Sequence, residues 1–185
     1  MSSTTAPAQT GHTYNLDAAH SSAAFVVRHL AIAKVRGHFN GITGSIQLPA
    51  AGHLPVSVEA VIDAASVDTR DAQRDGHLKS PDFFDVANHP QLTFRSTRIE
   101  GTEEAFRLTG DLTIHGTTRE VTFDATFEGA AGDPWGNQRV AYEASAKISR
   151  KDFGMTFNQT LESGGLLVGD EVKIELNVEA IGAKA

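Results

Sequence analysis

Eight histidines and no cysteine set the first limits on the chemistry of this chain. No two histidines have the H-x-H or H-E-x-x-H spacing of a zinc site, so a metal centre would need ligands from separate strands. His20, His29 and His38 fall on neighbouring predicted strands and could converge in this way. The lack of cysteine excludes disulfides and thiolate ligands. We therefore expect neither a metal site nor another cofactor.

Catalytic signatures are also missing from the sequence. It contains no G-x-S-x-G nucleophile turn, no P-loop and no G-x-G-x-x-G sequence that opens a helix. His29 is the best candidate for acid–base chemistry, because strand alternation places it on the same face as Phe25 and Val27. It can equally be a strand-end histidine that is bonded to the backbone. We expect no catalytic residues, and an enzyme that uses His29 is the alternative hypothesis.

The charge and the hydropathy of the chain exclude several classes of partner. The 185 residues carry a net charge of −7, which disfavours nucleic acid and anionic membrane surfaces. No apolar run approaches the roughly 18 residues that span a bilayer, so we expect no stable membrane insertion. Residues 1–12 lack the charged and apolar regions of a signal peptide, and their composition predicts a disordered tail. The expected compartment is the cytoplasm.

Residues 106–128 give the clearest structural signal. Apolar and polar residues alternate from Phe106 to Ile114 and again from Val121 to Phe127, a period that indicates strands with one apolar face. Residues 115–118 supply the turn between them, with Gly116 free to adopt a positive φ. The sequence here predicts a long β-hairpin whose apolar face must be covered.

Similar alternation recurs along residues 13–181, which we expect to form one domain. The additional predicted strands lie near residues 14–16, 22–29, 35–39, 42–48, 56–62, 92–97, 140–148 and 172–180. The apolar residues that face inward have odd numbers up to Phe39 and even numbers from Ile42 onward. One extra residue between them would explain this change, which predicts a β-bulge near residues 40–41. Eight substantial antiparallel strands with short links favour an up-and-down barrel that removes exposed edges, and a two-sheet sandwich is the alternative.

Two segments interrupt the strand pattern. Residues 70–85 contain a short predicted helix, with Asp68 and Thr69 as candidate N-terminal caps, followed by Phe83 and Phe84. This insertion either plugs one end of the core or forms the rim of a pocket. Residues 150–169 have no period but carry several apolar residues, which is typical of a loop lying across an opening.

Ala144 and Ala146 share the inward parity of their predicted strand. Small side chains on an inward face leave room for a partner side chain or for a ligand. An eight-stranded barrel is either just filled by its own side chains or holds one small ligand. Composition and spacing thus predict a tall antiparallel barrel without naming what it binds.

Several segments, in this order, resemble the YceI-like family of polyisoprenoid-binding proteins over residues 14–180. The motifs that carry the resemblance are Asp17-x-x-His20-Ser21-x-x-x-Phe25-x-Val27-x-His29, Val35-x-Gly37-x-Phe39-x-Gly41, Ser66-Val67-Asp68-Thr69-x-x-x-x-Arg74-Asp75-x-His77-Leu78-Lys79-Ser80-x-Asp82-Phe83-Phe84-Asp85, His89-Pro90-x-x-x-Phe94-x-Ser96, Leu108-Thr109-Gly110-x-Leu112-Thr113-Ile114-His115-Gly116-Thr117-Thr118, Ser149-Arg150-x-Asp152-Phe153-Gly154 and Val168-Gly169-Asp170-x-Val172.

The resemblance implies an extended lipocalin-like barrel that holds an isoprenoid chain, of the polyprenyl or isoprenoid-quinone type, in an apolar tunnel. The tunnel wall would then comprise Phe25, Val27, Phe39, Phe94, Leu108, Leu112, Phe123, Ala144, Ala146, Phe153 and Phe157. The head group would lie near His29, Asp68, Arg70, Phe83 and Phe84. Many members of this family are exported, and no export signal is visible here.

Three functions remain open at this point. The chain binds and carries or sequesters an isoprenoid lipid, or it is an enzyme that acts on an isoprenoid or a related apolar metabolite through His29, or it is a barrel with a filled core that acts through its surface. For Asp68 and Arg70 the alternative is a surface ion pair. A homodimer that forms through an outward face is compatible with all three.

Overall fold

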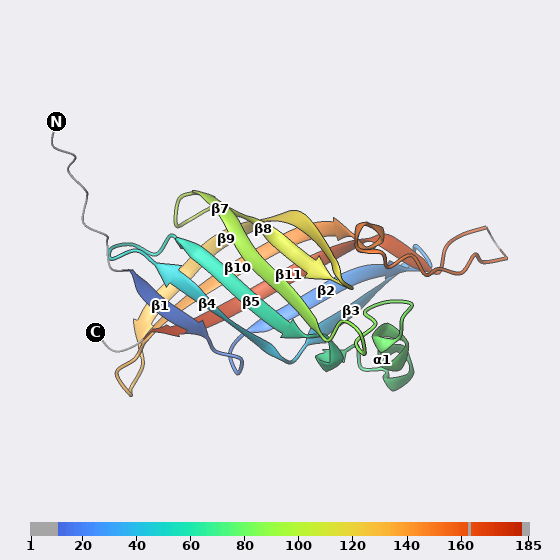
Figure 1. The fold of residues 1–185 in the computed structure, drawn as a ribbon, viewed down its shortest axis with the longest axis horizontal. Helices are drawn as coiled ribbons and strands as arrows, with labels where there is room; N and C mark the ends of the chain where they lie inside the picture. The colour runs from blue at the N-terminus through green and yellow to red at the C-terminus, as the bar shows by residue number, and fades with distance from the viewer. Residues whose placement is uncertain (1–10, 163, 183–185) are drawn as a thin grey trace.

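Eleven β-strands join into one antiparallel sheet in a computed structural model that describes residues 11–162 and 164–182 (Figure 1). Their bounds are β1 (His12–Leu16), β2 (Ser22–His29), β3 (Ala33–Phe39), β4 (Ile42–Leu48), β5 (Ser57–Asp63), β6 (Val67–Asp68), β7 (Gln91–Gly101), β8 (Phe106–Ile114), β9 (Thr117–Gly132), β10 (Gln138–Ser149) and β11 (Val168–Gly182). Three helical segments stand between them: η1 (Ala64–Ser66), α1 (Ala72–Lys79) and η2 (Arg150–Phe153).

The sheet closes on itself because both β1 and β2 pair with β11. β1 pairs with the end of β11, where Leu16 stands opposite Ala180, and β2 pairs with its first half, where Phe25 stands opposite Ile174. In the same way, β2 pairs with β3 and β1 pairs with β4. Next around the sheet, β3 pairs with β6 and β4 pairs with β5. Three interrupted and five continuous strands therefore give eight positions around the barrel. The predicted eight-stranded antiparallel barrel is confirmed.

The hairpin of β8 and β9 shows why these residues form strands. Leu108 faces Phe123 across the ladder, and both are buried, while Asp111 on the opposite face is exposed. His115 and Gly116 form the two-residue turn with φ values of 51° and 70°, the left-handed conformation that such hairpins favour. Gly116 takes the positive φ that the sequence predicts.

The expected irregularity at residues 40–41 is a break between strands instead of a bulge within one. Phe39 ends β3 and Ile42 begins β4, and both side chains are buried. Between them, the backbone N–H of Asn40 bonds to Ser66 instead of to the strand that pairs with β3. The break allows Phe39 and Ile42, which are three residues apart, both to point into the barrel.

A matching break separates β1 from β2, where Asp17 meets a cluster of charged side chains. Arg139 donates hydrogen bonds to the carboxylates of Asp17, Asp133 and Glu179. Hydrogen bonds from His20 and Arg139 lower the pKa of Asp17 to about 2. Burial alone would raise the pKa of Asp133, but hydrogen bonds from the Asn137 amide and from Arg139 outweigh it and lower this pKa also to about 2.

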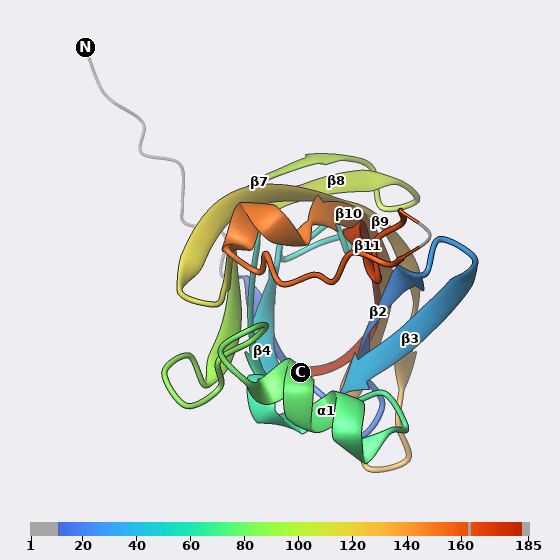
Figure 2. The same cartoon turned by 90° about the vertical axis from the view of Figure 1, so that its right-hand side faces the viewer.

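The helical insertion lies where the sequence predicts it, but a different residue caps the helix. The side chain of Asp71 accepts a hydrogen bond from the backbone N–H of Arg74 at the start of α1. Neither predicted cap takes this role: Asp68 accepts a hydrogen bond from the N–H of Arg70, whose φ of 62° turns the chain before the helix begins, and the hydroxyl of Thr69 donates to Asp75. Figure 2 shows α1 at one end of the barrel, on the side opposite the segment that follows η2.

Arg150 organises that segment. Its guanidinium is buried and donates to the carbonyls of Met155, Phe157, Val168 and Gly169, with Asp170 as its carboxylate partner. Because one planar group holds residues 155–157 and 168–170 together, these two stretches are fixed along one side of this end of the barrel. Burial lowers the pKa of Arg150, against the effect of Asp170.

The predicted tail, residues 1–12, falls almost entirely outside the described residues, and β1 already begins at His12. Among the residues that the structure describes, no helix has the length and the apolar character required to cross a membrane.

Candidate functional site

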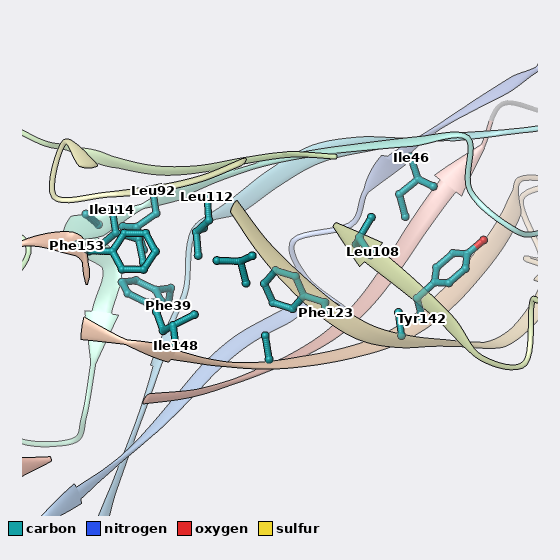
Figure 3. Close-up of a cluster of buried hydrophobic side chains, with 14 of the residues drawn as sticks. Phe39, Ile46, Leu92, Leu108, Leu112, Ile114, Phe123, Tyr142, Ile148 and Phe153 are labelled. Carbon is teal, nitrogen blue, oxygen red and sulfur yellow. The ribbon is translucent and has the colours of Figure 1, made fainter. Parts of the chain in front are cut away.

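The lumen of the barrel contains a cavity of about 570 Å³. This volume lies within the range of about 300–1,000 Å³ that is usual for small-molecule pockets. Apolar side chains from nearly every strand line it, as Figure 3 shows for part of the wall, where Leu112, Phe123 and Leu108 follow one another along the barrel. The lumen is therefore not filled by its own side chains, which removes the main support for a barrel that acts only through its surface.

Most of the residues that were assigned to a tunnel wall line this cavity. They are Phe25, Val27, Phe39, Phe94, Leu108, Leu112, Phe123, Ala144 and Phe157. All but Phe157, which follows η2, come from strands far apart in the sequence, and the closed sheet brings them together.

Ala146 and Phe153 do not line the cavity, although both are buried. Ala146 has the inward parity, but its neighbours Ile148 and Ile174 reach the cavity and its one-carbon side chain does not. Phe153 belongs to η2, and Figure 3 shows it with Leu92 and Ile114 at one end of the buried cluster. Parity alone could not distinguish a buried side chain from one that borders an open space.

Polar groups border the cavity at the end that carries α1. They come from the end of β2, from residues 69–77 and from η2, and they are Arg28, His29, Thr69, Asp71, Gln73, Arg74, His77 and Arg150. Thr69 is buried, and Arg74 holds it in place by donating from Nε to its hydroxyl at 2.7 Å and from a terminal nitrogen to its carbonyl at 2.8 Å. This mixed rim contrasts with the apolar wall deeper in the barrel.

Of the residues predicted to lie near a head group, His29, Phe83 and Phe84 line the cavity at this rim, and Asp68 and Arg70 do not. The Asp68 carboxylate, 43% exposed, lies 3.8 Å from the imidazole of His38 on the outside of the barrel. Since its other oxygen accepts from the backbone of Arg70, Asp68 has a structural role in the turn before α1.

Three aromatic rings connect the two sides of the rim. The ring of Phe157 lies 4.7 Å from that of His77 and 5.5 Å from that of Phe83, measured between centroids. His77 is held in turn by the carboxylate of Asp82, 2.8 Å away. Because Phe157 follows η2 and His77 belongs to α1, this contact joins the loop to the helix over the edge of the cavity.

Tyr142 lies at the opposite end of the lumen (Figure 3). Its hydroxyl donates to the carbonyl of His53 at 2.6 Å, and the His53 ring stacks on Phe127 with centroids 4.4 Å apart. Burial raises the pKa of the Tyr142 hydroxyl, with a further contribution from the charge of Glu103. The loop between β4 and β5 is thereby tied to β10 at this end.

His29 provides little support for catalysis. It ends β2 and is half-buried, and its imidazole has no hydrogen-bond partner among the residues that the structure describes. A general acid or base needs a group that orients it and fixes its tautomer. Within residues 11–162 and 164–182, no side chain orients the best candidate for acid–base chemistry in this way.

Sequence reasoning omitted Arg74, His77 and Tyr142 from the candidate site. Tyr142 belongs to the same inward series as Ala144, so the alternation already pointed to it. The two α1 residues had no such signal, because a helix of eight residues with no buried side chain does not show which of its faces meets the cavity.

The YceI-like domain, as a family model, matches residues 14–180 of this chain. UPF0312 protein SA2479 from Staphylococcus aureus is 36% identical over 167 residues, which cover 90% of this chain and 95% of that protein. Among solved structures, a YceI protein from Campylobacter jejuni is similar with a TM-score of 0.72 and 30% identity, over 85% of this chain and 90% of that one. A polyisoprenoid-binding domain from Saccharophagus degradans has a TM-score of 0.64 and 17% identity, over 92% of this chain and 98% of that domain, and this likeness concerns the fold.

Proposed function

The chain belongs to the YceI-like family, and from this premise we propose that its barrel binds an isoprenoid lipid in the lumen and carries or sequesters it. The observation that supports the proposal most is the cavity of about 570 Å³ with an apolar wall and a polar rim at one end. The polyisoprenoid-binding domain of Saccharophagus degradans has the same fold, which agrees with a ligand of this class.

The shape of the barrel suits an elongated ligand. β11 has 15 residues, about 50 Å of strand, which at the usual tilt of barrel strands covers about 35–40 Å along the axis. Branched aliphatic and aromatic side chains line the cavity, which β11 borders from Val168 to Val178. Burying each carbon of a ligand there contributes about 0.8 kcal/mol, so a five-carbon isoprene unit contributes about 4 kcal/mol before the cost of ordering the chain.

The polar rim defines the orientation that we propose for the ligand. The prenyl tail extends toward Tyr142, and the head group, of the polyprenyl or quinone type, remains near His29 and Arg74. A head group placed at the rim keeps its own hydrogen bonds, whereas at the other end the Tyr142 hydroxyl already donates to the His53 carbonyl.

Native mass spectrometry on delipidated protein tests this proposal. We expect prenyl lipids to form one-to-one complexes that become more stable as the number of isoprene units rises, until the lumen is full. Straight-chain fatty acids of equal carbon number should compete poorly if the wall is shaped for branched chains. Equal retention of both classes would show a general apolar pocket, and a lack of any complex would refute lipid binding.

A further inference from the structure

A cluster of metal-ligating side chains lies next to the rim and outside the cavity. Asp85 and His89 belong to the segment between α1 and β7, and His115 belongs to the β8–β9 turn. One possible ligand atom from each residue lies within 4.8 Å of the other two. The rings of His89 and His115 meet edge to face with centroids 5.4 Å apart, and His89 Nε2 is 4.0 Å from Asp85 Oδ2.

We propose that Asp85, His89 and His115 bind a divalent transition-metal ion such as Zn²⁺. Two imidazoles and one carboxylate are the ligand types that Zn²⁺ takes in sites with an open fourth position. Tetrahedral bonds of about 2.0–2.1 Å place the ligand atoms about 3.3 Å apart. The ligand atoms of the three side chains must therefore approach one another by about 1 Å, and rotation of the side chains allows this.

Hydrogen bonds with neighbouring groups hold two of these side chains in place. His115 Nδ1 lies 3.3 Å from the carbonyl oxygen of Phe153, and because a carbonyl only accepts, this nitrogen carries the proton. The lone pair of Nε2 is then free for a metal. The Asn88 amide donates to both oxygens of Asp85, at 3.1 and 3.0 Å. Such outer contacts to a backbone carbonyl and an amide are typical of metal ligands.

Gly116 leaves the space that the ring of His89 occupies. A Cβ at Gly116 would lie 2.5 Å from Cε1 of His89, so no other residue at this position would allow the ring to rest on the turn. At Gly154, by contrast, a Cβ would make only ordinary contact with His115, at 3.4 Å from its Nδ1. The His89 ring thus occupies a space that Gly116 of the turn keeps open.

A second cluster of similar composition provides an internal comparison. Asp17, His20 and Glu179 also bring their ligand atoms within 4.8 Å of one another. There the guanidinium of Arg139 bonds to both carboxylates and supplies the cation. Around Asp85, by contrast, no lysine or arginine nitrogen lies within 4.0 Å in the described part of the chain. The Asp17 cluster therefore already has its positive charge, whereas among the described residues no lysine or arginine supplies one to the Asp85 cluster.

Metal titration of untagged, chelator-treated protein tests the site. Co²⁺ should give the intense visible absorption of a four-coordinate complex at one ion per chain, and Zn²⁺ should displace it. Asp85→Asn and His115→Asn should each weaken binding by more than about 100-fold, since loss of an outer contact alone costs about 10–100-fold. Both substitutions keep a residue that tolerates the positive φ of 49° and 51° at these positions.

His20→Ala, in the cluster that Arg139 occupies, is the matched control and should leave binding unchanged. His89→Ala is a third ligand variant, at a position where the backbone φ is not positive. Circular dichroism of each metal-free variant checks that the fold is retained. The proposal is overturned if the parent protein binds no stoichiometric ion, or if the ligand variants bind as tightly as the parent.

Discussion

Ala144→Trp is the substitution that most directly separates the lumen from the rest of the molecule. Ala144 lies in the middle of β10, between Ala125 of β9 and Leu176 of β11, and it lines the cavity together with both. An indole at this position projects into open space, so the usual cost of overpacking, about 1–3 kcal/mol, is an upper limit for the loss of stability. The barrel should therefore fold, with its lumen blocked partway along.

The effect on ligand binding follows from the length of chain that is excluded. An indole displaces at least one five-carbon isoprene unit from the lumen. At about 0.8 kcal/mol for each buried carbon, the ligand loses about 4 kcal/mol, which weakens binding roughly 1,000-fold. A long prenyl chain that enters from the rim should lose more than a short one, because every unit beyond Ala144 is excluded.

Glu143→Trp is the matched control, since it adds the same side chain one residue away on the exposed face of the same strand. The assay is the amount of lipid that each purified variant retains, measured by native mass spectrometry, with the unfolding temperature as a check of the fold. Loss of lipid in Ala144→Trp alone supports a ligand in the lumen. If Ala144→Trp retains lipid at the level of Glu143→Trp, the proposed path of the ligand is wrong.

Three further substitutions test the surrounding structure. Tyr142→Phe removes the hydrogen bond to the loop between β4 and β5, and denaturant unfolding should show a loss of about 1 kcal/mol; an unchanged midpoint would mean that this loop is not fixed by the hydroxyl. Arg139→Gln should destabilise the protein most above pH 4, because the carboxylates of Asp17 and Asp133 have pKa values near 2 when folded, below their ordinary 3.8. Their ionised forms stabilise the fold at higher pH, and this contribution is lost as the pH falls toward 2, so the difference from the parent should shrink in acid; a difference independent of pH would contradict the assignment. Arg150→Lys keeps the charge but not the planar set of donors, and we expect a loss of about 2–4 kcal/mol in unfolding free energy with faster release of bound lipid, whereas unchanged release would show that the segment after η2 does not control it.

Alternation was a sufficient guide to the barrel because one face of each strand borders the lumen. The pattern of β8, with Phe106, Leu108, Leu112 and Ile114 inward, is visible in the sequence and is retained in the structure. The breaks between strands were harder to recognise. At residues 40–41 the change of parity was evident, but its form depends on Ser66, which is distant in the sequence and accepts the freed backbone hydrogen bond.

The candidate site was predictable only in part, because parity shows which way a side chain points and not what lies in front of it. Ala144 and Ala146 look equivalent in the sequence, yet only the first borders the cavity. Asp68 was assigned to the rim because it ends a strand, and the local turn directs it outward to His38. The cluster of Asp85, His89 and His115 had no spacing signal, since it forms only when a loop packs against a hairpin turn.

Solvent extraction of the freshly purified protein, followed by mass spectrometry of the extract and of the intact complex, tests the central proposal most directly. We predict a prenyl lipid at about one molecule per chain, and an intact mass that exceeds the bare chain by the mass of that lipid. Expression together with a prenyl-lipid supply should increase the occupied fraction. A protein that remains at the mass of the bare chain under both conditions would contradict the account.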